Sequence, residues 1–302
     1  MSRAAHTCLR TACLVCAAAL FLPSLGCANE RPVIARASTS PPLAYHVHLP
    51  GIGGYRSIDR MLLQGLQEGG LDAQIEPYDW TEKDPGLSAL LATQRHKVQA
   101  ERVCAMLRRH ADEHPSARLT VSAHSGGAGI VVWALEQLPN DVKIDQLVLL
   151  APALSPDYDL TSALRHVRQK AYVFYSPYDV AVLGLGTRMF GTIDGQKVEA
   201  SGKVGFAKPA SADDRQYAKL VQVPYASEWV KHGNIGDHIG ALSRPFGKQI
   251  LAPLMLTGEL PQPAAEAQAT GLNTPPPALT PPPALTPAPA AGAAPGRAPG
   301  AA

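Results

Sequence analysis

The sequence predicts an α/β fold, a doubly wound, mostly parallel sheet of about six strands with helices on both faces. Three observations predict it. Strand-length apolar runs alternate with helix-length amphipathic segments from residue 43 to residue 257, which is typical of βαβ units. The strand segments are apolar almost throughout, as expected for a sheet covered on both faces. Glycine clusters follow two of the strands, where the ligand sites of such sheets lie.

The individual elements follow from apolar spacing and from the glycines and prolines between the runs. The apolar residues of 57–67 have the spacing of a helix, and Gly69-Gly70 just after them predict where that helix ends. The run Leu147-Val148-Leu149-Leu150 is typical of a buried strand. Strands are expected at 45–49, 74–78, 118–123, 143–150, 171–175 and 219–223. Helices are expected at 57–67, 87–107, 126–137, 160–169 and 239–256.

Residues 1–27 are typical of an export signal peptide. Arg3 and Arg10 flank the start of a short apolar stretch, Pro23 interrupts it, and small residues lead to Cys27. This end resembles the lipobox of bacterial lipoproteins, in which the cysteine is acylated. The resemblance implies lipidation at Cys27 and an exported, membrane-anchored protein of the periplasm or cell surface. An ordinary cut after Ala28 would instead give a soluble periplasmic or secreted protein.

The rest of the chain divides into a linker, one domain and a tail. Residues 28–42 are expected to be the linker and residues 43–257 the globular domain. Residues 258–302 are rich in proline and alanine and repeat the hexapeptide TPPPAL, which predicts a disordered tail. Four of the five cysteines precede residue 28, so only Cys104 remains and no intramolecular disulfide is expected in the processed chain.

Charge and hydropathy exclude two classes of protein. The chain has 27 Lys and Arg against 25 Asp and Glu, a balance that argues against binding nucleic acid through phosphate contacts. Arg3 and Arg10 account for the whole excess. The sequence has no apolar run of the roughly 18–20 residues that span a bilayer, so a multi-span membrane protein is also excluded.

The third expected strand leads into Ala123-His124-Ser125-Gly126-Gly127, and a helix follows. This segment resembles the nucleophile elbow of the α/β-hydrolase family, small-x-Ser-x-small, with Ala123 in place of the more common first glycine. The neighbours of the serine must be small because strand and helix meet at a sharp turn. The resemblance covers nearly all of the domain and makes Ser125 the expected nucleophile.

In that family an acid and then a histidine follow the nucleophile along the chain. The resemblance places the acid at Asp179, after the fifth strand, and leaves Asp213 and Asp214 as weaker choices. It places the histidine at His238, at the start of the last helix, with His232 as the alternative. The histidine would act as the base, and the acid would orient it.

The resemblance also implies an oxyanion hole made of backbone donors. One donor would be the N–H of Gly126. The other would be the N–H of Ile52, since Pro50-Gly51-Ile52 resembles the His-Gly-x loop of the family with Pro50 in place of its histidine. Few residues separate Cys27 from the first expected strand, so the antiparallel strands that open the sheet in larger members of the family are not expected. The resemblance therefore implies a minimal sheet, as in cutinase-like and small lipase-like members.

The remaining histidines have less specific expectations. His46 and His48 share one face of a strand, and such a pair can bind metal, but no downstream ligand set accompanies it and no metal is expected. His124 is expected to pack or to bond locally. Three helical histidines are expected on a solvated face: His96, His110 and His114.

The sequence thus predicts a serine hydrolase that cleaves an ester-like bond (a carboxylic ester, a lipid or a thioester) through a Ser-His-Asp triad and an acyl-enzyme. Its substrate would be a small-molecule or lipid ester, with no cofactor and no nucleic-acid partner. The alternative is a non-catalytic lipoprotein that keeps the fold as a binding scaffold. The sequence leaves open the substrate, the oligomeric state and whether residues 180–216 form a lid.

Overall fold

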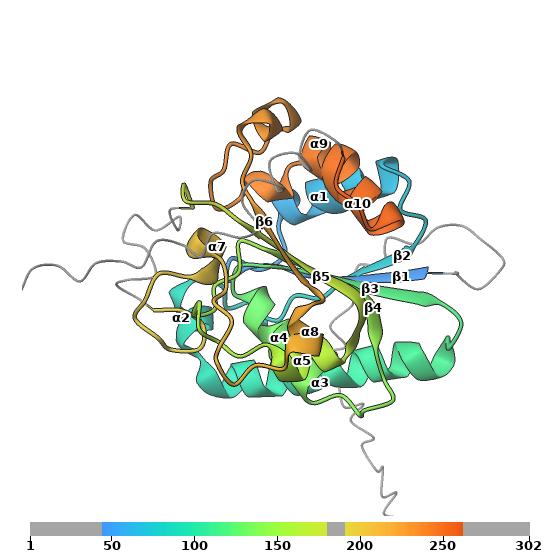
Figure 1. The fold of residues 1–302 in the computed structure, drawn as a ribbon, viewed down its shortest axis with the longest axis vertical. Helices are drawn as coiled ribbons and strands as arrows, with labels where there is room; N and C mark the ends of the chain where they lie inside the picture. Colours follow the sequence, from blue (N-terminus) through green and yellow to red (C-terminus); the bar gives the residue numbers. More distant parts are fainter. Residues whose placement is uncertain (1–43, 180–190, 262–302) are drawn as a thin grey trace, which may run out of the picture.

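The computed structural model describes residues 44–179 and 191–261 (Figure 1). The predicted signal peptide with Cys27, the predicted linker and nearly all of the predicted tail lie outside these residues. Within them, no helix is both long enough and apolar enough to cross a bilayer.

The described residues form a six-stranded sheet in the order β2-β1-β3-β4-β5-β6. Every neighbouring pair is parallel, from His46 opposite Ile75 at one side to Phe174 opposite Val223 at the other. This is the predicted fold class. The strands are β1 Ala44–Leu49, β2 Gln74–Pro77, β3 Arg118–His124, β4 Ile144–Leu150, β5 Val167–Tyr175 and β6 Leu220–Pro224.

Helices cover both faces of the sheet (Figure 1). In the view of Figure 1 the upper layer contains α1 Ser57–Glu68, α9 Arg244–Phe246 and α10 Ala252–Thr257. The lower layer contains α2 Leu87–Leu91, α3 Thr93–Glu113, α4 Gly127–Glu136, α5 Thr161–Arg165 and α8 Asp214–Tyr217. The short helix α7 Ser201–Val204 lies near the carboxyl end of β5, where Ser176 N–H donates to the Gly202 carbonyl.

The strand order reverses at β1. From β1 the chain passes through α1 to β2 on one side, and then through α3 to β3 on the other side of β1. Loops that leave β1 and β3 therefore diverge at their carboxyl ends, which opens a crevice in sheets of this kind. The two glycine clusters noted in the sequence lie in these loops.

Residues of β1 and β3 alternate between two environments. Odd-numbered side chains, such as Val47 and Val121, join the apolar core beneath α3 and α4. Even-numbered side chains face the α1 side, and there both strands carry polar groups. We call these buried residues the polar stripe: His46, His48, Thr120, Ser122 and His124.

Two helices in the first two thirds of the domain differ from expectation. The predicted helix at 160–169 ends at Arg165, because Val167 already pairs with Ile144 and is fully buried as the first residue of β5. The predicted helix at 87–107 is two helices separated at Ala92, and the second extends to Glu113. Local spacing does not show where a sheet partner starts.

The predicted helix at 239–256 is also interrupted. It consists of a 3₁₀ turn at Gly240–Leu242, then α9, a π-helical turn at Gly247–Leu251 and α10. Pro253 lies in the first turn of α10 and has no N–H to donate to the preceding turn. A wider π turn just before a proline accommodates the missing hydrogen bond.

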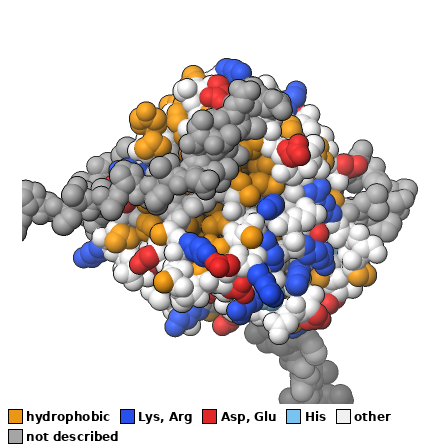
Figure 2. Space-filling view, viewed as in Figure 1, with side chains coloured by type: hydrophobic (Ala, Val, Ile, Leu, Met, Phe, Trp, Pro, Cys, Tyr) orange, Lys and Arg blue, Asp and Glu red, His pale blue; other side chains and the backbone are white. Residues whose placement is uncertain are grey.

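Charged side chains are unevenly distributed on the face shown in Figure 2. Lys and Arg side chains gather below and to the right of its centre, toward the amino ends of the strands. The apolar side chains that show on this face lie mostly at the centre and upper left. On this face the basic groups thus gather away from the carboxyl ends of the strands.

Candidate active site

Ser125 lies at the turn from β3 to α4, at the carboxyl edge of the sheet. Its φ of 51° is in the left-handed region, which residues other than glycine rarely adopt. Its N–H donates to the Leu150 carbonyl of β4 (3.0 Å). Its carbonyl accepts from the N–H groups of Ala128 and Ala153, both at 3.1 Å. Bonds on both sides of the residue thus hold a strained turn that presents the side chain.

Small residues after Ser125 let α4 begin against the end of β1. A Cβ added to Gly127 would lie 2.4 Å from the Pro50 carbonyl oxygen and 2.9 Å from that of Leu49. A Cβ added to Gly126 would lie 2.8 Å from Cγ2 of Ile52. These distances are too short for a side chain, so the glycines are required where the sequence pattern predicts small residues.

The structure brings the three predicted catalytic residues together. His238 Nε2 lies 2.9 Å from Ser125 Oγ, and His238 Nδ1 lies 2.8 Å from Asp179 Oδ1. Ser125 and Asp179 are buried, and the His238 side chain is 14% exposed. Because a carboxylate only accepts hydrogen bonds, Nδ1–H donates to Asp179, and Nε2 is left to accept the Ser125 hydroxyl proton. This order of groups is the one that a serine nucleophile requires.

Short turns fix the loops that carry Asp179 and His238. Asp179 N–H donates to the Ser176 carbonyl (2.9 Å), which closes a turn directly after β5. In the other loop Gly236 N–H donates to Oδ1 of the buried Asn234 (2.9 Å). Gly236 has a φ of 85°, and a Cβ there would lie 3.0 Å from Ser176 Oγ. The two loops thus pack on each other, and Asn234 and Ser176 are supporting residues that the sequence analysis missed.

The alternative base and acids lie elsewhere. His232 ends the 3₁₀ helix Ser227–His232, and its carbonyl accepts from Ser243 Oγ (2.8 Å). Asp213 caps α8, and Asp214 pairs with Lys208. Within residues 44–179 and 191–261, His238 is the histidine that contacts both Ser125 and a carboxylate.

The loop after β1 lies beside Ser125, since a Cβ added to Gly51 would lie 3.1 Å from Ser125 Cβ. Trp80 Nε1 donates to the Pro50 carbonyl (2.7 Å), and Gly86 N–H donates to the Ile52 carbonyl (2.6 Å). The N–H groups of Ile52 and Gly126 donate to no other group in the described part of the chain. Ile52 and Gly126 are neighbours, since a Cβ added to Gly126 would lie 2.8 Å from Ile52 Cγ2.

His124 is buried and packs against the His238 ring, as one of its two expected roles, but its hydrogen bond joins a residue far away in the sequence. Its Nε2 donates to the main-chain carbonyl of His238 (2.9 Å), and the two rings lie 4.9 Å apart. Burial lowers the pKa of His124 to about 3, and the neighbouring His238 adds to that effect. The ring is therefore neutral at ordinary pH.

Four residues of the polar stripe form a continuous hydrogen-bond chain, which accounts for His46 and His48: Thr120, His46, Ser122 and His48. His46 bonds to Thr120 Oγ1 through Nδ1 and to Ser122 Oγ through Nε2, both at 2.9 Å. His48 bonds to Ser122 Oγ through Nδ1 (2.8 Å) and to Asp59 Oδ1 through Nε2 (3.2 Å). Every ring nitrogen of the pair thus has a protein partner.

Asp59 ends this chain at the first turn of α1. Burial raises the pKa of Asp59, but hydrogen bonds from His48 and the Arg56 N–H outweigh it, so the pKa lies below the ordinary value. An ionised Asp59 accepts from His48 Nε2–H, so His48 Nδ1 accepts from Ser122.

Among the described residues, no cluster of three His, Cys, Asp or Glu side chains could hold a metal ion.

The expectation of a solvated histidine face on α3 is wrong for two of its three members. His96 is buried and lies 2.7 Å from the Ala89 carbonyl through Nε2. His110 is buried and lies 2.9 Å from Glu76 Oε2 of β2. Their partners lie on other elements, so helical spacing alone could not identify this side of α3 as buried.

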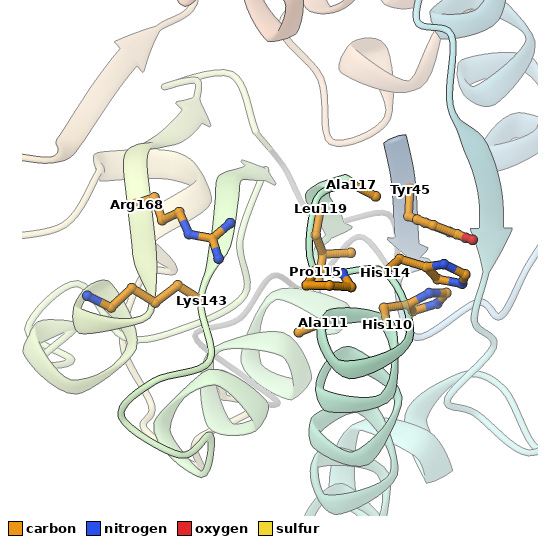
Figure 3. A pocket seen from close by; sticks show the side chains of 9 residues that line it. All are labelled: Tyr45, His110, Ala111, His114, Pro115, Ala117, Leu119, Lys143 and Arg168. Carbon is orange, nitrogen blue, oxygen red and sulfur yellow. The ribbon is translucent and has the colours of Figure 1, made fainter. Parts of the chain in front are cut away.

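A hollow lies at the amino ends of the strands (Figure 3). The ring of Tyr45 lies 4.6 Å from the rings of both His110 and His114, and His114 is half-buried. Figure 3 shows Lys143 pointing away from these rings, and Arg168 bonds to Asp145. This hollow lies at the amino ends of the strands, whereas Ser125 lies at their carboxyl ends.

Apolar side chains border the residues that carry the acid and the base. Tyr178, next to Asp179, is 64% exposed. Ile235 is 59% exposed, and Ile239, next to His238, is 38% exposed. Large apolar groups exposed at a site are available to an apolar ligand. We refer to Tyr178, Ile235 and Ile239 as the apolar rim.

Residues 180–216, for which the sequence leaves open a role as a lid, are described only in part. Residues 180–190 lie outside the described residues. After them, Ile193 N–H donates to the Ala153 carbonyl (2.9 Å), and Ile193 and Phe206 are buried in the core. A Cβ added to Gly129 would lie 2.4 Å from Ile193 Cγ2. This part of the segment therefore packs on the start of α4.

One protein-family model matches residues 93–209, and it is described as an alpha/beta hydrolase of unknown function (DUF900). The match covers less than half of the chain. It includes Ser125, Gly126 and Asp179 and ends before His238. A comparison with curated proteins found no match.

Solved structures of similar fold include esterases and lipases. Aspergillus fumigatus lipase B is 12% identical with a TM-score of 0.46 over 74% of this chain and 54% of that one, so the similarity spans about half of the lipase. The poly(3-hydroxybutyrate) depolymerase LpqC from Bordetella parapertussis is 12% identical with a TM-score of 0.45, over 75% and 84% of the two chains. These are similarities of fold. The family match, together with the parallel sheet and the strained strand-to-helix turn at Ser125, supports an α/β-hydrolase fold for the described residues.

Proposed function

We propose that this protein is a serine hydrolase that cleaves an ester-like bond through an acyl-enzyme. The observation that carries the proposal is the chain of contacts Ser125–His238–Asp179 at a strained strand-to-helix turn. A hydroxyl is a weak nucleophile unless a base removes its proton, and a histidine oriented by a buried carboxylate is such a base.

The proposed reaction has two stages. Ser125 Oγ attacks the carbonyl carbon while His238 Nε2 takes its proton, and Asp179 stabilises the imidazolium. The tetrahedral intermediate then expels the alcohol (or thiol), which receives the proton from His238. In the second stage His238 takes a proton from water, the hydroxide attacks the acyl-enzyme, and the acid leaves as Ser125 recovers its proton.

The Ile52 and Gly126 N–H groups support the proposal electrostatically. Negative charge develops on the carbonyl oxygen as Ser125 attacks, and backbone donors aimed at it lower the barrier. Both groups lie beside Ser125 without another acceptor among the described residues. Backbone donors do not have to reorganise when the charge appears.

The apolar rim supports an ester with an apolar group. Tyr178, Ile235 and Ile239 lie close in sequence to Asp179 and His238, and their exposed side chains are large and apolar. An alkyl or aryl group of the substrate would bury part of this surface and gain about 25 cal/mol per Å² of apolar area. Small-molecule and lipid esters both have this chemistry.

A fluorophosphonate probe tests the proposal. The wild type should be labelled and should hydrolyse p-nitrophenyl esters, whereas Ser125→Ala should do neither. Ser88→Ala, which changes an exposed serine on α2, is the matched control and should behave as the wild type. Equal labelling of wild type and Ser125→Ala would contradict the proposal, and no labelling of either would favour a binding scaffold.

We also propose that Cys27 anchors the exported protein to a membrane through a lipid. The support is the lipobox-like sequence before Cys27. Cys27→Ser should move the protein from the membrane fraction to the soluble fraction of the expressing cell. An unchanged distribution would show that the anchor is absent.

A further inference from the structure

His124 is a buried histidine that the proposed reaction does not use. It precedes Ser125 on β3 and is 6% exposed. Its hydrogen bond to the His238 carbonyl (2.9 Å) joins positions 114 residues apart. The strand that carries the nucleophile is therefore tied directly to the loop that carries the base.

His238 has few other anchors. It lies outside regular helix and strand, between the Asn234 turn and the 3₁₀ turn that begins at Gly240. Asp179 holds the ring through Nδ1. His124 holds the main chain from which that ring projects. The bond to Asp179 fixes the ring of His238, and the bond to His124 fixes its main chain. We expect that neither bond alone can set the position of Nε2.

We propose that His124 is a positioning residue, which holds the His238 main chain where Nε2 reaches Ser125 Oγ. The inference rests on the proposed function and adds a residue to it. His124 and Ser125 are consecutive, so one rigid strand end sets both sides of the Ser125–His238 contact. A displacement of about 1 Å at a catalytic group can cost about 100-fold in rate.

A neutral donor suits this position. His238 becomes an imidazolium during the proposed reaction, and a second positive ring 4.9 Å away would oppose that charge. Burial keeps His124 uncharged, since it lowers the pKa of the ring to about 3. A lysine or arginine could donate the same bond but would bring a charge.

The surroundings of His124 hold its ring in one orientation. A Cβ added to Gly51 would lie 2.9 Å from His124 Nδ1 and 3.1 Å from Ser125 Cβ. The loop after β1 therefore packs directly on both residues. On the same face of β1 and β3 lies the rest of the polar stripe, whose side chains are bonded to one another. Tight packing of this kind limits rotation of the ring.

Three substitutions separate the hydrogen bond from general packing. In His124→Gln the amide nitrogen reaches about the place of Nε2 and can still donate to the His238 carbonyl. In His124→Asn it reaches only about the place of Nδ1, and His124→Leu has no donor. We expect kcat for a p-nitrophenyl ester to fall about 10- to 100-fold in the Asn and Leu variants, with KM within about threefold. The Gln variant should keep kcat within about threefold of the wild type.

Thr120→Val is the matched control. It removes a buried hydroxyl from the same face of β3, bonded to His46 and distant from Ser125. It should lower the melting temperature and leave kcat unchanged. Titration with the fluorophosphonate probe gives the folded, labelled fraction, so that kcat is counted per active molecule in every variant.

The outcomes separate this inference from the proposed function. A wild-type protein that is neither labelled nor active overturns both. An active wild type with unchanged kcat in His124→Asn overturns the inference alone. So does a Gln variant that loses as much kcat as the Leu variant, or a Thr120→Val variant that loses as much as His124→Asn, because either result would reflect packing.

Discussion

At each end of the parallel strands, the carboxyl edge and the amino edge of the sheet, a histidine is bonded to a carboxylate. At the carboxyl edge His238 lies 2.8 Å from Asp179, and at the amino edge His110 lies 2.9 Å from Glu76. In the first pair the other ring nitrogen meets Ser125 Oγ. In the second pair Nδ1 of His110 has no partner among the described residues.

This difference shows that a histidine–carboxylate pair does not by itself make a site. The amino-edge pair lies between a helix and β2, and aromatic packing against Tyr45 covers it. The carboxyl-edge pair lies on loops, and a strained turn brings a hydroxyl to its free nitrogen. A rigid scaffold with functional groups on its loops is the common arrangement in α/β folds.

Replacement of the two histidines should give the largest contrast. His238→Gln removes the base, and kcat for a p-nitrophenyl ester should fall by about 10⁴-fold or more. His110→Gln should leave kcat within about twofold and lower the free energy of unfolding by about 1–2 kcal/mol, because it weakens the bond to Glu76. Steady-state kinetics and urea unfolding measure both. Comparable losses of activity in the two variants would contradict the expectation that only the His238–Asp179 pair takes part in the reaction.

Replacement of the two carboxylates should give a smaller contrast. Asp179→Asn keeps the size of the side chain but not the charge that orients and stabilises His238, and kcat should fall about 10³- to 10⁴-fold. Glu76→Gln is the matched change and should leave kcat unaltered. An Asp179→Asn variant with wild-type kcat would mean that another group orients His238.

The comparison extends to His46 and His124, which are buried without a carboxylate partner. Burial lowers the pKa of each to about 3, from an ordinary value of 6.5. Above pH 6.5 each is neutral in both the folded and the unfolded chain, so neither changes stability there. Below pH 6.5 only the unfolded chain binds the protons, so stability falls as pH falls toward 3.

At pH 5 the loss should be about 2 kcal/mol for each of these two residues. Urea unfolding at pH 7, 6 and 5 measures it. His46→Gln, although less stable at pH 7, should show a shallower decline because one such group is gone. An identical slope in the wild type and the variant would place the origin of the decline elsewhere.

The smallest expected effect concerns the apolar rim. Ile239→Ser should lower kcat/KM for octanoyl esters about fivefold, which corresponds to about 1 kcal/mol of lost apolar contact, with little change for acetyl esters. Leu91→Ser changes an exposed apolar residue of α2 that is not part of the rim and is the control. If both variants change the chain-length preference equally, the rim does not contact the substrate.

Most of the fold followed from local patterns. The strand runs and the sharp Ala123–Gly127 segment are properties of neighbouring residues, so they could be predicted without knowing their partners. The order of acid and histidine along the chain narrowed the choice to Asp179 and His238, and the structure brings both to Ser125.

What could not be predicted depends on distant partners. The bond from His124 to the His238 carbonyl, and the Asp59 that ends the polar stripe, join segments whose contact the spacing of residues does not reveal. The burial of His110 depends on Glu76 of another element. In the same way, β5 begins at Val167 because β4 offers it a partner, which shortens the preceding helix.

The bond from Ser125 N–H to the Leu150 carbonyl has a consequence for how the protein reaches its native state. The nucleophile turn is completed only when β4 has joined β3, and the base arrives from a position 113 residues further along the chain. Contacts of such separation close late, because their loop entropy must be overcome first. Partly folded chains with native helices would therefore lack the assembled Ser125–His238 contact.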